Sequence, residues 1–91
     1  MTTLAASTSH LRTSSTLAAM KVGSTARLVA LRLPEREASW LRAVGLYEGV
    51  LLTPLRYAPL GGPVHFRTST GAELAIDLEL ARAVDVESLS P

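Results

Sequence analysis

The candidate metal ligands in this 91-residue sequence are His65, Asp77 and Glu79, with Glu73 as a further candidate. Imidazole and carboxylate groups are ligands for divalent transition metals such as iron and zinc. No two of these residues have the spacing of a preformed site, and a lone histidine with scattered acids is usually a solvated surface. We therefore interpret them as surface residues. The alternative is a divalent iron or zinc ion that bridges two molecules in a homo-oligomer, each giving one or two ligands.

Catalytic chemistry has little support in the sequence. There is no cysteine, which removes thiol catalysis, disulfides and thiolate zinc sites together. No nucleophile, base and oxyanion donors occur as a recognisable set, and Gly61-Gly62 stands between prolines rather than in a phosphate-binding loop. We therefore expect a protein that is not an enzyme. Nine basic and eight acidic residues give a net charge of +1, which is too balanced for the basic face that nucleic-acid binding needs.

Three large apolar or aromatic residues are candidates for contact with a protein partner: Trp40, Tyr57 and Leu60. Tryptophan is favoured at interfaces. Tyr57 and Leu60 lie beside a proline- and glycine-rich loop, residues 59–63, of the kind that SH3-type barrels use to hold extended peptides. For Trp40 we prefer a second interpretation, a large core residue that closes the mouth of a barrel, because a small core needs aromatic volume. The same ambiguity applies to Tyr57 and Leu60.

The segment that carries Trp40 is predicted to be a helix. Pro34 suits its first position, where the missing N–H is not needed. Apolar residues recur every three positions and form its buried face: Ala38, Leu41 and Val44. A glycine then ends the helix in the left-handed conformation. We interpret three glycines as backbone requirements at positions of positive φ, rather than as functional residues: Gly45, Gly49 and Gly71.

The rest of the chain is rich in short β-forming segments. Strands are expected over residues 25–33, 50–58, 64–68, 72–76 and 84–86, with single helical turns near 17–20 and 78–82. Pro54 cannot donate a hydrogen bond within a sheet, so its strand is expected to lie at an edge or to carry a bulge.

The clearest local signal is a hairpin around Ser69-Thr70-Gly71. A three-residue hairpin loop ends on a left-handed residue, usually glycine, and Gly71 stands there. The resulting register places Phe66 opposite Leu74 and Arg67 opposite Glu73, so that apolar residues meet and opposite charges face each other.

These elements predict one mostly β domain over residues 16–87, a small closed antiparallel barrel of five strands with one short helix. Residues 1–15, rich in Ser, Thr and Ala, are expected to be a disordered extension, with a mis-assigned start codon as the alternative. Residues 88–91 are expected to be a tail. No apolar stretch approaches the roughly 20 residues of a membrane-spanning helix, so membrane association is expected only through a partner.

Three segments together resemble the FeoA family: residues 41–49 (LRAVGLYEG), 58–64 (APLGGPV) and 73–76 (ELAI) leading into 80–86 (LARAVDV). The resemblance covers about residues 16–87. It implies an SH3-like barrel that acts with FeoB, a membrane ferrous-iron permease with a cytoplasmic GTPase domain. It also implies a relationship to the C-terminal SH3-like domains of iron-dependent repressors. With no helix-turn-helix before the barrel, a free-standing transport accessory fits this sequence better.

The leading hypothesis is therefore a cytoplasmic accessory protein that binds the cytoplasmic part of FeoB and modulates iron uptake. Metal-dependent assembly and a regulatory domain that meets a DNA-binding repressor in trans are the alternatives. The sequence departs from the family at two places. Gly62 stands where the family often has aspartate, and Asp77 and Glu79 stand in a stretch that is often basic.

Overall fold

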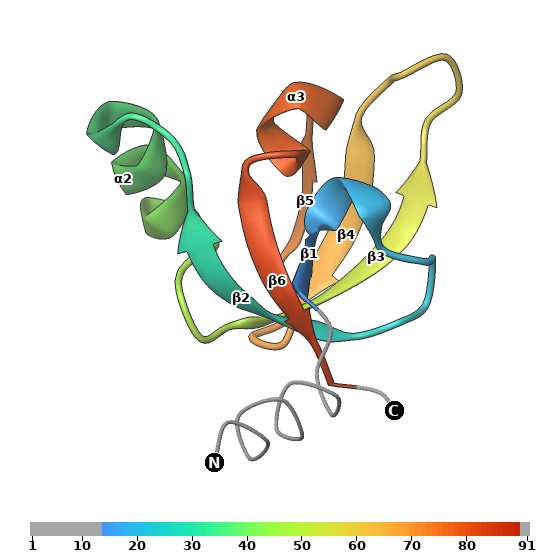
Figure 1. Cartoon of the computed structure of the whole chain (residues 1–91), viewed down its shortest axis with the longest axis horizontal. Helices are drawn as coiled ribbons and strands as arrows, with labels where there is room; N and C mark the ends of the chain where they lie inside the picture. Colours follow the sequence, from blue (N-terminus) through green and yellow to red (C-terminus); the bar gives the residue numbers. More distant parts are fainter. Residues whose placement is uncertain (1–13, 90–91) are drawn as a thin grey trace, which may run out of the picture.

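The computed structural model describes residues 14–89, which form a mostly β domain with short helices (Figure 1). Along the chain the elements are β1 (Ser14–Thr16), the 3-10 turn η1 (Leu17–Ala19), β2 (Ala26–Leu31), α2 (Glu35–Ala43), β3 (Leu51–Tyr57), β4 (Val64–Thr68), β5 (Glu73–Ile76), α3 (Leu78–Ala81) and β6 (Val84–Ser88). Within these residues no helix is long and apolar enough to cross a bilayer.

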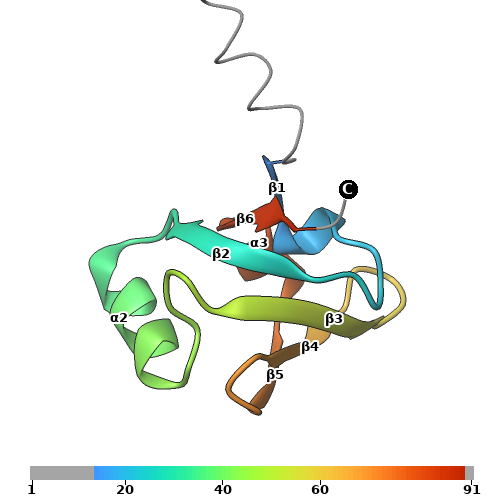
Figure 2. The same ribbon diagram turned by 90° about the horizontal axis from the view of Figure 1, so that it is seen from below.

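All six strands belong to one antiparallel sheet in the order β1-β6-β2-β3-β4-β5. The sheet folds over, so that β2 and β6 lie in one layer and β3, β4 and β5 in the other (Figure 2). The predicted class, a small SH3-like antiparallel fold, is confirmed. The predicted closure and the count of five strands are wrong, because β1 adds a sixth strand and the edge strands β1 and β5 do not pair with each other among the described residues.

The missed strand, β1, comes from Ser14–Thr16 and pairs with β6. Three consecutive hydroxyl residues show no apolar alternation, so nothing in their pattern signals a strand. The sequence predicts residues 14 and 15 to belong to the N-terminal extension, and they lie instead in β1; the other residues of that extension lie outside the described part of the chain. Ser88, expected in the tail, is the last residue of β6.

The hairpin and the bulge agree with the sequence. β4 and β5 pair in the predicted register, with Phe66 opposite Leu74 and Arg67 opposite Glu73. The pairing of β3 with β4 shifts between Pro54 and Arg56, which is the bulge that the proline required. The three glycines expected at positive φ all have it, with φ of 111° at Gly45, 97° at Gly49 and 97° at Gly71.

Helix α2 ends in a Schellman motif. Gly45 has positive φ, its N–H donates to the Arg42 carbonyl at 3.1 Å, and the N–H of Leu46 donates to the Leu41 carbonyl at 2.9 Å. This turn directs Leu46 into the core, where it is fully buried beside Leu41. The chain after the helix is thereby returned to the sheet, where Val50 leads into β3.

The core lies between the two layers of the sheet. Both layers contribute alternate residues of their strands to this core. Phe66 of β4 is the largest side chain with no exposed surface. The other buried members of the cluster are Leu17, Ala26, Leu28, Leu41, Leu46, Val50, Leu52, Val64, Ile76, Ala81, Val84 and Val86.

Candidate functional site

The predicted partner-binding residues lie in two separate places rather than in one patch. Trp40 is on α2, whereas Leu60 is in the loop that joins β3 to β4. Figures 1 and 2 show α2 at one end of the molecule and this loop at the opposite end. A single compact interface therefore includes one end or the other, but not both.

Trp40 is a surface residue with 60% of its area exposed. Our preferred interpretation of it, a core residue that closes the barrel, is wrong. On α2 the buried positions are Ala38 and Leu41, and Trp40 falls on the outer side of the helix. Leu46, which the Schellman turn brings inward, is a fully buried member of the core.

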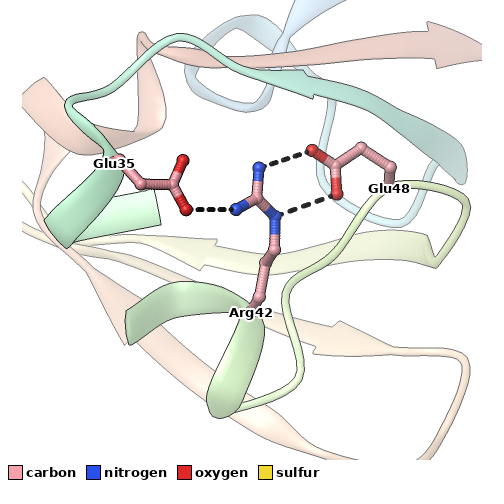
Figure 3. Close-up of polar contacts among 3 residues, drawn as sticks. All are labelled: Glu35, Arg42 and Glu48. Carbon is pink, nitrogen blue, oxygen red and sulfur yellow. Dashed lines mark hydrogen bonds and ion pairs between the residues drawn. The ribbon is translucent and has the colours of Figure 1, made fainter. Parts of the chain in front are cut away.

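A charged cluster fixes the turn that follows α2 (Figure 3). The Arg42 guanidinium donates from Nε to Glu48 Oε1 at 3.2 Å and from Nη2 to Glu48 Oε2 at 3.0 Å, and from Nη1 to Glu35 Oε2 at 3.2 Å. The hydrogen bond from Arg42 holds the pKa of the Glu48 carboxyl below its usual value. Its contribution to stability is present at neutral pH and is lost as the pH falls through that lowered pKa. One guanidinium and two carboxylates give this cluster a net charge of −1, so it is not a basic feature for a partner to recognise.

Tyr57 is an internal connection more than a surface residue. Its hydroxyl lies 2.9 Å from the Leu17 carbonyl oxygen and 2.5 Å from that of Met20, which ties η1 to the end of β3. The hydroxyl has one hydrogen, so it donates to one of these carbonyls at a time. What Tyr57 can offer a partner is the part-exposed ring and not the hydroxyl.

We expect Tyr57→Phe to destabilise the fold by about 1–2 kcal/mol, because the one hydroxyl hydrogen that the Leu17 and Met20 carbonyls share is lost in a part-buried site. Burial raises the pKa of the Tyr57 hydroxyl above its ordinary value of about 10. The folded chain therefore holds this proton more tightly than the unfolded chain. That stabilisation is complete below pH ~10 and is lost as the pH rises through the folded pKa. Urea unfolding of both chains from pH 8 to 11.5 is the measurement. Equal stability of the two chains at pH 8 would contradict the assigned hydrogen bonds.

The loop between β3 and β4 is a tight, closed turn. The N–H of Gly62 donates to the Pro59 carbonyl at 3.2 Å, and the two residues between them, Leu60 and Gly61, have φ of 61° and 75°. Positive φ at both central positions is the pattern of a type I′ hairpin turn, in which glycine, asparagine and aspartate dominate the first position. Here that position is Leu60, the one described residue other than glycine with positive φ.

Leu60 is unfavourable in this turn for two reasons. The left-handed conformation costs a side chain with a β-carbon about 1–2 kcal/mol. The leucine is also fully exposed, at 103% of its reference area, so its side chain gains nothing from packing within the chain. The sequence places Leu60 in a loop between prolines, but φ was not predictable there, because leucine is not a residue that signals a left-handed turn.

Gly62 closes the same turn for a different reason. A β-carbon added there would lie 2.8 Å from the β-carbon of Ala58 and 3.3 Å from the carbonyl oxygen of Pro59. The first distance is too short for two carbon atoms, and neither neighbour is a flexible side chain. Glycine is thus the residue that fits this loop at position 62.

The predicted metal ligands do not converge. Asp77 caps α3, with Oδ1 accepting from the Leu80 N–H at 2.9 Å, and Glu79 pairs with Arg82 at 2.7 Å. His65 lies on β4 directly opposite Arg56 of β3, whose positive charge opposes a metal cation. Over the described residues, no three His, Asp or Glu side chains form a group that could hold a metal ion. A metal bridge between two molecules stays a prediction, and sedimentation with and without a chelator tests it.

The match to known proteins decides the family. The model of the FeoA domain matches residues 15–88, which is nearly the whole described chain. The chain belongs to the FeoA family. That family is associated with ferrous-iron transport, and one solved FeoA-type structure with this fold is described as iron(II) transport protein A of Clostridium thermocellum.

Solved FeoA structures share this fold. The FeoA protein of Chlorobium tepidum is 28% identical, with a TM-score of 0.76 over 82% of this chain and 70% of that protein. An iron uptake regulatory protein (FeoA) is 26% identical, with a TM-score of 0.70 over 81% of this chain and 94% of that protein. No curated protein is a significant match to the sequence.

A manganese-dependent transcriptional repressor has the same fold in part of its chain. It is 19% identical, with a TM-score of 0.77, and the match covers 84% of this chain but 37% of the repressor. At this identity the likeness concerns the fold alone. The relationship to repressor domains that the sequence resemblance implied is therefore structural.

Proposed function

We propose that this protein is a non-enzymatic accessory of ferrous-iron uptake that binds the cytoplasmic part of a FeoB-type permease and modulates its transport or GTPase cycle in the cytoplasm. The observation that carries the proposal is the FeoA-domain match over residues 15–88. A domain that small, with few groups suited to chemistry, acts best by binding another protein.

The surface supports a binding role more than a chemical one. The three predicted metal ligands are engaged within the chain: Asp77 caps α3, Glu79 pairs with Arg82, and His65 lies opposite Arg56. Large apolar side chains, in contrast, are exposed at both ends of the molecule, Trp40 on α2 and Leu60 on the β3–β4 loop. A partner that docks at either one of these ends would find a large apolar side chain to bury.

The direct test is calorimetry of the purified chain against the cytoplasmic part of the permease, with GTP hydrolysis measured in the same mixture. We expect binding in the micromolar range or tighter and a change in the hydrolysis rate that saturates with the amount of chain added. The absence of heat and of any rate change at tens of micromolar would contradict the proposal.

A further inference from the structure

We propose that Leu60 is the anchor of the partner interface, and that the turn of residues 59–62 presents it to an apolar pocket on a protein. The inference rests on the proposed function and goes one step further, because it assigns the binding to one end of the molecule and to one side chain. The pocket it requires is about the size of a leucine side chain and is lined by aliphatic or aromatic groups.

The first argument is that Leu60 is unfavourable in the isolated chain. Its φ of 61° belongs to glycine and asparagine, and its side chain is fully exposed. Asparagine at this position would relieve the backbone and would be well hydrated. A residue that is disfavoured both by its conformation and by its solvation, with no contact inside the chain, is typical of a functional position.

The second argument is that the turn is already ordered without a partner. The Gly62 N–H bonds the Pro59 carbonyl at 3.2 Å, and the Ala58 N–H bonds the Pro63 carbonyl at 2.9 Å. Two prolines, Pro59 and Pro63, restrict the backbone on either side. A side chain held on an ordered turn loses little conformational entropy on binding, so more of its contact energy is available for affinity.

The third argument distinguishes a protein pocket from a lipid surface. Burying one leucine strengthens binding by roughly 10- to 100-fold. A whole myristoyl chain gives an association constant of only about 10⁴ M⁻¹ with a bilayer, so one leucine cannot hold the chain there. Arg56 is the one cation in the segment 56–63, so the turn itself carries no basic cluster to attract acidic lipids. A fluid lipid surface also has no use for a fixed side-chain direction, whereas a shaped pocket does.

The test compares four chains for binding to the cytoplasmic part of the permease: wild type, Leu60→Asn, Leu60→Met and Trp40→Ala. We expect Leu60→Asn to weaken binding about 10- to 100-fold, because the apolar side chain is lost. Leu60→Met keeps an apolar side chain of similar volume and is expected to stay within about threefold of wild type. Trp40→Ala removes a larger exposed apolar side chain at the other end and is likewise expected to stay within about threefold.

The melting temperature provides a readout that a merely structural role would not give. Since asparagine suits the left-handed conformation, Leu60→Asn is expected to melt about 3–6 °C above wild type while it binds less well. A lower melting temperature for Leu60→Asn would overturn the proposal, because Leu60 would then serve the fold. Equal weakening by Trp40→Ala would overturn it too.

Two further outcomes separate this inference from the proposed function. If the wild type binds the permease and Leu60→Asn binds equally well, the anchor is wrong while the function stands. If the wild type does not bind, both the proposed function and the Leu60 anchor are contradicted.

Sedimentation with vesicles of phosphatidylglycerol and phosphatidylethanolamine is the last experiment. Binding of the wild type to these vesicles, lost in Leu60→Asn, would assign Leu60 to lipid and overturn the protein pocket.

Discussion

Gly62→Asp is expected to destabilise the fold by about 1–3 kcal/mol. The reason is steric. Any β-carbon at residue 62 would lie 2.8 Å from the β-carbon of Ala58, and the backbone of the 59–62 turn would have to open to relieve the clash. Opening the turn would also lengthen the hydrogen bond from Gly62 N–H to the Pro59 carbonyl. Thermal and urea unfolding of the variant and the wild type measure the loss.

The variant Gly62→Ala distinguishes the effect of the added β-carbon from the effect of the carboxylate charge that Gly62→Asp also adds. We expect it to lose most of what Gly62→Asp loses, because the clash involves the β-carbon alone. Ala58→Gly removes the other side of the clash, so the double variant Ala58→Gly, Gly62→Ala is expected to be more stable than the sum of the single effects by about 1 kcal/mol or more. Additive single effects would show that the two residues do not meet and that the tight turn is misassigned.

The parts of the fold that were predictable are those that the local sequence determines. The register of the 64–76 hairpin follows from the position of Gly71 and from the alternation on both sides of it, and the structure has the same pairs. Pro54 required a bulge or an edge, since it lacks an N–H, and a bulge is present. The helix end at Gly45 needed only the rarity of positive φ in other residues.

The parts that were not predictable depend on distant contacts. Strand β1 exists because the exposed edge of β6 accepts Ser14–Thr16, and three hydroxyl residues carry no signal of that pairing. Trp40, which was expected in the core, is 60% exposed, whereas Leu46, a residue beyond the helix, is fully buried there. Periodicity within α2 identified the buried face correctly at Ala38 and Leu41, but it gave no information on which residue beyond the helix would complete the packing.

In the candidate site too, some features were predictable from the local sequence and others depended on contacts that the fold supplies. The loop that holds Leu60 was recognisable from its prolines and glycines, but its left-handed φ was not, because no local rule assigns that conformation to leucine. Asp77 and Glu79 carry the residue types of metal ligands, yet one caps a helix and the other pairs with Arg82. Residue type predicts what a side chain can do, and the neighbours that the fold supplies determine what it does.

Phe66→Ala is expected to have the largest effect on stability in this domain, a loss of about 3–5 kcal/mol. Phe66 has no exposed surface and lies on β4 between Pro54 of β3 and Leu74 of β5, so three strands face the cavity that alanine would leave. A domain of this size has a total stability of about 5–15 kcal/mol, so the loss is a large share of it. The melting temperature is expected to fall by roughly 12 °C or more.

Two comparisons separate the effect of Phe66→Ala on stability from an effect on permease binding. Val29→Ala removes a strand residue that is 49% exposed and is expected to change stability by less than about 0.5 kcal/mol, which separates burial from strand position. Permease binding by Phe66→Ala is expected to fall only in proportion to its unfolded fraction and to recover on cooling toward 10 °C, where the fold is again populated. Leu60→Asn is expected to bind weakly at every temperature at which it is folded. If Phe66→Ala melted within a few degrees of wild type, Phe66 would not be the centre of the core. The order of the 59–62 turn would then not depend on packing around Phe66.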